Sequence, residues 1–181
     1  MRLEKIISKR DSLELEISII EPKMAPKGIV QLSHGMAEHK ERYYDFMSYL
    51  AKQGYICVIH DHRGHGASVR KQEDLGYFYS EDINCIVDDL YQVTEFIKER
   101  YKGLELILFS HSMGTLVASN YLKKYDSQIE KVILCGPPTK NPLTPAAIFL
   151  AEGFKFFKGD RYINEFLNKL SFGSYNKGNE L

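Results

Sequence analysis

The 181-residue sequence has no excess of charge of either sign, because 24 lysines and arginines balance 24 aspartates and glutamates. A nucleic-acid-binding protein needs a basic face, so this balance argues against a nucleic-acid partner. Long uncharged runs are missing too: the longest candidate, residues 141–151, is too short to span a membrane and holds two prolines. Residues 1–10 lack the apolar core of a signal peptide. We therefore expect a cytoplasmic protein.

Cysteine is scarce, and the three cysteines Cys57, Cys85 and Cys135 show neither metal-binding nor redox spacing. Cys57 and Cys135 lie inside apolar runs. We expect both to be small buried core residues in a reducing compartment.

The chain up to residue 138 alternates between strand-like and helix-like segments. The first two strands are joined by a polar turn and indicate an antiparallel pair, and the later, continuously apolar strands indicate a parallel sheet with helices on both faces. Ser80 is expected to cap the second helix, whose apolar face includes Ile83. We predict strands at 2–7, 13–20, 28–32, 55–59, 106–109 and 129–135, and helices at 42–53, 81–102 and 114–125.

A serine motif, Ser-His-Ser-Met-Gly at residues 110–114, lies between a predicted strand and a predicted helix. Strand, sharp turn with a central serine, and helix form a nucleophile elbow, in which the turn lifts the serine hydroxyl above the sheet. Ser112 is therefore a candidate nucleophile. The N–H of Met113, at the helix N-terminus, is a candidate oxyanion donor. Ser110 replaces the usual first glycine, and the alternative is that Ser112 merely caps the helix.

A second loop, residues 33–39, follows the strand at 28–32. Gly35 allows the backbone to approach a substrate closely, and the N–H of Met36 is the natural second oxyanion donor. Taken alone, this segment is explained better as an ordinary glycine turn with two solvated histidines.

Three histidines, His60, His62 and His65, raise the question of a metal site. Zinc hydrolases that resemble metallo-β-lactamases carry an HxHxDH run, but its aspartate position is Gly64 here. Few other histidines could complete the three protein ligands that a catalytic zinc requires. We predict no metal, and a structural loop in which Asp61 and Arg63 form hydrogen bonds that brace the strand ends.

Taken together, residues 34–39, Arg42 and Tyr43, residues 61–66 and Ser112 resemble, in order and spacing, the monoacylglycerol lipase and lysophospholipase group of α/β-hydrolases. The resemblance extends over nearly the whole chain. It implies an α/β-hydrolase core at residues 1–138 and the start of a cap at 139–181, whose interleaved aromatic residues and lysines could line an acyl chain, pack on the core or make weak contact with a membrane surface.

The same resemblance implies the chemistry. Ser112 is the nucleophile, the N–H groups of Met36 and Met113 form the oxyanion hole, and Gly35 and His111 contact the substrate. The substrate is a carboxylic ester, often of glycerol or lysophospholipid, and no cofactor is needed. Two alternatives stay open: a prolyl-aminopeptidase-like peptidase of the same fold, and a non-catalytic fragment that binds lipid or a partner.

Histidine is absent after Ser112. The triad of this fold runs serine, aspartate, histidine along the chain, and a serine hydroxyl is a weak nucleophile without its base. Because losing the triad histidine costs on the order of 10⁶-fold in turnover, we expect the chain alone to be inactive. We also expect the strand at 129–135 to expose an apolar edge, open to a complementary C-terminal segment or to a second copy.

Overall fold

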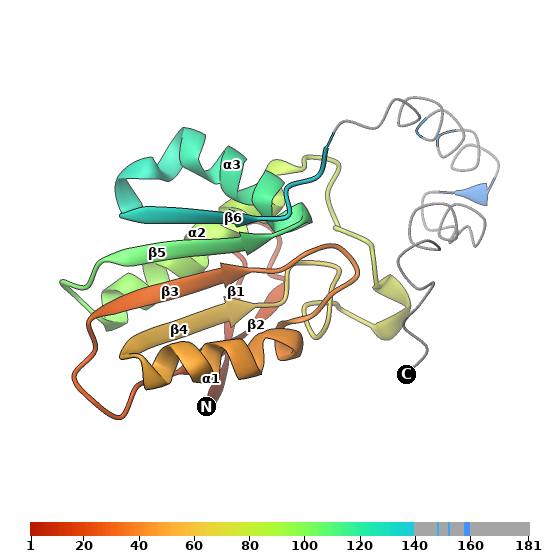
Figure 1. Cartoon of the computed structure of the whole chain (residues 1–181). Helices are drawn as coiled ribbons and strands as arrows, with labels where there is room; N and C mark the ends of the chain where they lie inside the picture. The colour runs from red at the N-terminus through yellow and green to blue at the C-terminus, as the bar shows by residue number, and fades with distance from the viewer. Residues whose placement is uncertain (140–147, 149–151, 153–157, 160–181) are drawn as a thin grey trace, which may run out of the picture. The chain divides into compact units, whose positions relative to one another are not determined.

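The protein is described from a computed structural model, which describes residues 1–139 together with Ile148, Glu152, Lys158 and Gly159. The chain divides into two compact units, Met1–Pro138 and Thr139–Leu181. All of the elements below belong to the first unit (Figure 1). The aromatic residues of the predicted cap lie outside the described residues, so the cap remains a prediction. No helix in the described part of the chain is long and apolar enough to cross a membrane.

Six strands form one mixed sheet in the order β1-β2-β4-β3-β5-β6. The predicted antiparallel opening pair is confirmed, since β1 pairs antiparallel with β2, and β2 antiparallel with β4. The other pairs, β3 with β4, β3 with β5 and β5 with β6, are parallel. The strands are β1 Arg2–Ile7, β2 Glu14–Ile20, β3 Gly28–Ser33, β4 Tyr55–His60, β5 Leu106–His111 and β6 Lys131–Cys135.

Helices cover both faces of this sheet, as predicted (Figure 1). Successive side chains of a strand point to opposite faces. Ile29 of β3 accordingly packs into a core with α2 and α3, while Val30 packs with Met47 of α1 on the other face. The helices are α1 Tyr44–Lys52, α2 Asn84–Arg100 and α3 Met113–Tyr125, with short 3₁₀ turns η1 Lys40–Tyr43, η2 Gln72–Asp74 and η3 Asp126–Gln128.

The start of α2 differs from the prediction. The Ser80 hydroxyl accepts a hydrogen bond from the Asp82 N–H (3.1 Å), before the helix begins, so Ser80 is not its cap. Asp82 instead accepts the N–H of Asn84, the first helical residue (3.0 Å). Ile83 precedes the first turn and its side chain is 63% exposed, so it does not belong to the buried face.

Strand β6 is also different, because it begins at Lys131 rather than Ile129 and all of its residues are exposed. It lies last in the sheet order, and among the described residues it pairs with β5 alone. Cys135 is therefore exposed rather than buried, whereas Cys57 and Cys85 lie in the core. The apolar residue Ile133 is 48% exposed at this edge, as the expected open edge requires.

Candidate active site

Ser112 lies at the turn between β5 and α3 and has φ 49° and ψ −118°, a conformation that non-glycine residues rarely adopt. Strain of this kind persists only where the surrounding structure imposes it, and it is the geometry of a nucleophile elbow. Within the described part of the chain, the Ser112 side chain makes no capping hydrogen bond to α3. Capping therefore does not explain the serine, and its half-buried hydroxyl remains available for chemistry.

Small residues allow the helix to pass close to the sheet at the elbow. A Cβ atom added to Gly114 would lie 2.3 Å from the carbonyl oxygen of Ser33, at the end of β3. Any side chain there would push α3 away from the sheet. Ser110 is buried, and its hydroxyl donates to the Ile133 carbonyl of β6 (3.3 Å). This hydrogen bond explains how a serine is accommodated where the motif usually has glycine.

The loop after β3 lies beside the elbow, because Ser33 of β3 pairs in register with Ser110 of β5. A Cβ atom on Gly35 would lie only 3.2 Å from the Cβ of Ser112, so the Gly35 backbone lies close to the nucleophile, and its approach to a substrate stays a prediction. In the described part of the chain the Met36 N–H donates no hydrogen bond. The Met113 N–H is the first of α3 and has no acceptor within the helix. Neither of the two predicted oxyanion donors thus has an acceptor in the part of the chain that the structure describes, and their role remains a prediction.

Glu38 is the residue of this site to which the sequence assigned no role. Its Oε2 atom accepts hydrogen bonds from the Gly35 N–H (2.8 Å) and the Tyr43 hydroxyl (2.8 Å), and Nδ1 of His111 lies 3.2 Å away. Its Oε1 atom accepts from Arg42 (2.8 Å). Burial acts to raise the pKa of Glu38, but the hydrogen bonds from Gly35, Tyr43 and His111 outweigh it and lower the pKa. The group is therefore a carboxylate at neutral pH.

His111, predicted to contact substrate, has its ring held beside this carboxylate. Since a carboxylate only accepts hydrogen bonds, Nδ1 is assigned as the protonated nitrogen that donates to Glu38. Among the described residues, no hydrogen bond joins His111 to Ser112. The histidine next to the nucleophile in sequence is thus paired with Glu38 and not with the serine hydroxyl.

Histidines from the ends of β3 and β4 and from the loop after β4 pack together. His34, His60, His62 and His65 are buried, and the rings of His34 and His60 lie 4.5 and 4.6 Å from that of His62. Nε2 of His34 accepts the His62 N–H (2.9 Å), which requires this nitrogen to be unprotonated. Burial lowers the pKa of both His34 and His60 to about 4, so the cluster is neutral at physiological pH.

Asp61 forms hydrogen bonds as predicted, but to the start of η1 and to its own loop rather than to a strand end. Its carboxylate accepts the backbone N–H of Lys40 (2.7 Å) and of Ala67 (2.9 Å). Gly66 has φ +48°, and a Cβ atom there would lie 2.3 Å from the Asp61 carboxylate. The loop can therefore close around Asp61 only with glycine at this position.

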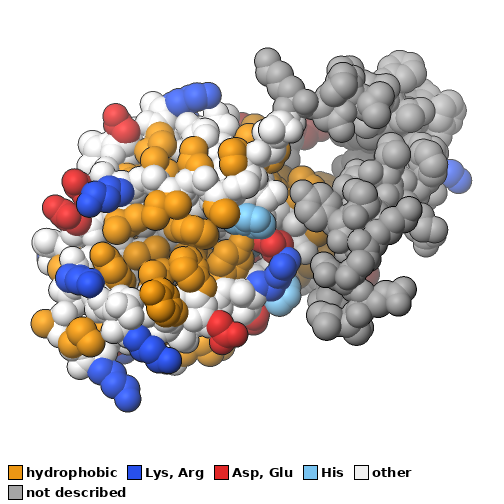
Figure 2. Space-filling view, in the orientation of Figure 1, with side chains coloured by type: hydrophobic (Ala, Val, Ile, Leu, Met, Phe, Trp, Pro, Cys, Tyr) orange, Lys and Arg blue, Asp and Glu red, His pale blue; other side chains and the backbone are white. Residues whose placement is uncertain are grey.

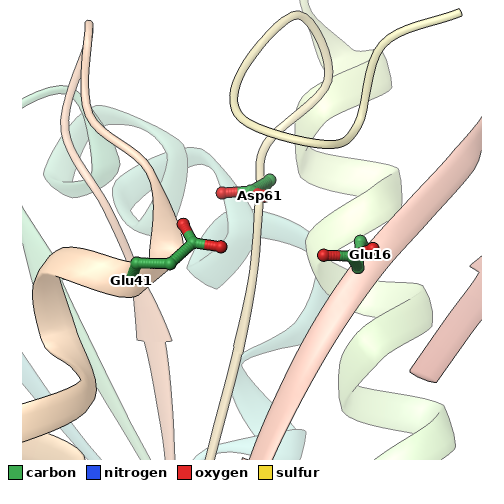
Figure 3. Close-up of side chains that lie close together, drawn as sticks. All are labelled: Glu16, Glu41 and Asp61. Carbon is green, nitrogen blue, oxygen red and sulfur yellow. The ribbon is translucent and has the colours of Figure 1, made fainter. Parts of the chain in front are cut away.

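Three carboxylates, of Glu16, Glu41 and Asp61, converge beside this loop with one oxygen each within 4.8 Å of the others (Figure 3). Among the described residues, these three carboxylates are the group whose oxygen atoms lie close enough together to hold a metal ion. His60, His62 and His65 are not part of this group. The Lys40 ammonium lies 2.8 Å from Glu16 and 2.7 Å from each of the other two. The lysine thus already supplies the positive charge that this acidic cluster requires.

Arg63 braces the other side of the loop. Its guanidinium is fully buried and donates twice to Asp89 of α2, from Nε (2.7 Å) and Nη2 (3.2 Å). Nη1 donates to Asp11 in the β1–β2 turn (3.1 Å) and to the Phe78 carbonyl (2.9 Å). One side chain therefore ties the loop to the opening strand pair and to α2, which confirms the predicted bracing role.

A strained serine between a parallel strand and a helix, beside a glycine loop at the end of the adjacent strand, places the protein in the α/β-hydrolase class. The solved structure of a thermostable carboxyl esterase from Bacillus coagulans has the same fold, with a TM-score of 0.83 at 22% identity over 99% of this chain and 58% of that one. The family model described as serine aminopeptidase, S33, matches residues 24–174, and the chain belongs to this family.

Two curated relatives in sequence are named as a lysophospholipase and a monoacylglycerol lipase. A probable lysophospholipase L2 from Haemophilus influenzae is 29% identical over 149 residues, which are 80% of this chain and 47% of that protein. A monoacylglycerol lipase from Mycolicibacterium smegmatis is 31% identical over 133 residues, 72% of this chain and 46% of that protein. The chain spans about half the length of these relatives.

Proposed function

We propose that the protein is a serine hydrolase of carboxylic esters, with a monoacylglycerol or a lysophospholipid as substrate. The observation that carries this proposal is the strained, uncapped Ser112, which lies close to Gly35, together with the two backbone N–H groups of Met36 and Met113, which have no acceptor among the described residues. The names of the relatives supply the class of substrate.

In this mechanism, Oγ of Ser112 attacks the ester carbonyl carbon while a histidine base takes the hydroxyl proton. The N–H groups of Met36 and Met113 stabilise the tetrahedral oxyanion. The alcohol leaves with the proton, and water then releases the acid from the acyl-serine. His111, the histidine next to the nucleophile in sequence, is held by Glu38 and is not assigned as this base.

An intact-mass experiment with a fluorophosphonate probe tests this proposal. Free imidazole can stand in for an absent histidine base, so we expect slow labelling of the chain that accelerates as imidazole is added and reaches one adduct per chain. Ser112→Ala should give no adduct, while Ser119→Ala, at an exposed position on α3, should label like the parent. An adduct that survives in Ser112→Ala, or none at any imidazole concentration, would contradict the role of Ser112. Rapid labelling without imidazole would show that the base lies within the chain.

A peptidase is the second candidate, because the matching family model is described as an aminopeptidase. Monoacylglycerols, short esters and aminoacyl amides offered under the same imidazole conditions distinguish the two. Turnover of the amides alone would favour the peptidase. Binding of lipid that survives in Ser112→Ala, without turnover by the parent chain, would favour the non-catalytic alternative.

We also propose that the edge strand β6 mediates association, with a complementary segment or with a second copy. Its support is the exposed Ile133, which pairs in register with the partly buried Phe109 of β5, on the sheet face where Phe109 packs against Phe46 of α1. Figure 2 shows apolar side chains gathered over this region. An unpaired strand edge with apolar residues readily pairs with another chain.

Sedimentation velocity at several protein concentrations measures this association. We expect concentration-dependent oligomers, and an association at least roughly tenfold weaker in Ile133→Lys because a lysine charge would be buried in the contact. Ile83→Lys is the matched control, since Ile83 is also an exposed isoleucine but lies before α2. A parent chain that stays monomeric at every concentration would overturn the proposal.

A further inference from the structure

One carboxylate oxygen connects three separate segments around the nucleophile. Oε2 of Glu38 faces the N–H of Gly35 in the loop after β3, the hydroxyl of Tyr43 in η1, and Nδ1 of His111 at the end of β5. Glu38 and His111 are 73 residues apart in the sequence. Glu38 thereby joins the loop that carries the candidate oxyanion donor to the strand that carries the nucleophile.

The carboxylate is held firmly enough to fix these segments. Its side chain is only 9% exposed, and hydrogen bonds to an ionised acceptor are roughly twice as strong as neutral ones. Arg42, four residues along, donates to the second oxygen, Oε1, at 2.8 Å and completes the restraint of the carboxylate plane. Both oxygens are therefore engaged, and the side chain has little freedom to rotate.

Gly35 lies between this carboxylate and the nucleophile. A Cβ atom on Gly35 would be 3.0 Å from Oε2 of Glu38 and 3.2 Å from the Cβ of Ser112. Because the Gly35 N–H is used by Glu38, it is not available to an oxyanion. The next N–H along the chain, that of Met36, is left without an acceptor in the described part of the chain.

We propose that Glu38 is a positioning residue that holds the Gly35 peptide against Ser112 and so selects the Met36 N–H as the oxyanion donor. This inference rests on the proposed function. Donors aimed at a developing oxyanion act on the transition state, and losing one costs about 10²–10³-fold in rate. Loosening the carboxylate should therefore lower the rate of the chemical step and leave ground-state binding nearly unchanged.

Glu38→Gln tests the proposal, because it keeps the shape of the side chain and removes its charge. Hydrogen exchange of the Gly35 amide, followed by NMR, should accelerate roughly tenfold or more as its charged acceptor is lost. Exchange at Leu108 in the core of β5 should not change. Glu99→Gln is the matched control, since Glu99 is an exposed glutamate near the end of α2, paired with Lys102.

The second measurement is the imidazole-dependent labelling of Ser112, analysed for probe binding and for the maximal rate separately. We expect Glu38→Gln to lower the maximal rate by at least roughly tenfold with little change in probe binding. Tyr43→Phe removes one donor to Glu38 and retains the carboxylate. It should accelerate Gly35 exchange and lower the maximal labelling rate, each by less than Glu38→Gln does. If Glu38→Gln fails to fold, this second variant decides.

The outcomes separate this inference from the proposed function. Faster Gly35 exchange with an unchanged labelling rate would make Glu38 merely structural and overturn the inference, as would unchanged Gly35 exchange. A parent chain that is never labelled would refute the proposed function and, with it, the catalytic part of the inference. The exchange measurement would then still show whether Glu38 holds the loop.

Discussion

Replacing Arg63 with methionine is expected to lower the free energy of unfolding by about 3–5 kcal/mol, because it leaves a buried carboxylate without its partner. Asp89 is 1% exposed, and two of its hydrogen bonds come from the Arg63 guanidinium. Burial raises the pKa of Asp89 even with Arg63 in place, which shows that the charged form is poorly solvated. Water therefore cannot replace the hydrogen bonds from Arg63 that the substitution removes. Urea denaturation followed by circular dichroism measures the change.

Two variants show whether the effect comes from the uncompensated charge. Arg70→Met removes an arginine that also pairs with Asp11 but is exposed, so its effect should stay within about 0.5 kcal/mol. Adding Asp89→Asn to Arg63→Met neutralises the buried carboxylate while keeping an acceptor for the Ser8 hydroxyl, and should recover part of the loss. A cost below about 1 kcal/mol for Arg63→Met would contradict this account.

Patterns that act over a few residues predicted the strands, the helices and the elbow. The apolar run before Ser112 and the glycine two residues after it are local signals, and the structure shows the expected strained turn there. The start of α2 was misplaced because two nearby groups compete as the cap. Ser80 and Asp82 both have side chains that can cap a helix. Only the fold shows that the Ser80 hydroxyl accepts the N–H of Asp82, which precedes the helix, while Asp82 accepts the N–H of Asn84.

Features that depend on which strands are neighbours could not be predicted from sequence. Cys135 was expected to be buried because its strand is apolar, but its exposure follows from the position of β6 at the end of the sheet. Arg63 was expected to brace the loop, yet nothing in the sequence pointed to Asp89 on α2 as its partner. The role of Glu38 emerges only when β3 and β5 pair and bring His111 next to it.

Acidification from pH 6.5 towards pH 4 is expected to remove several kcal/mol of stability. Burial lowers the pKa of His34 and of His60 from about 6.5 to about 4, and that of His62 well below its ordinary value. Between these values the unfolded chain binds more protons than the folded one, so stability falls as pH falls. At pH 5 the loss is about 2 kcal/mol for each of His34 and His60.

His60 allows this prediction to be tested without breaking hydrogen bonds, since neither of its ring nitrogens has a partner among the described residues. His60→Leu should gain about 2 kcal/mol over the parent between pH 7.5 and pH 5, measured by urea denaturation at each pH. His39→Gln, which removes an exposed histidine, is the matched control for the loss of an imidazole. Glu41, beside this cluster, does not contribute in this window: hydrogen bonds from Lys40 and His39 outweigh burial and lower the pKa of Glu41 to about 2, so its protonation matters only below about pH 4.5. An unchanged pH slope in His60→Leu would mean that this histidine is not kept neutral by the fold, and that the acid sensitivity arises elsewhere.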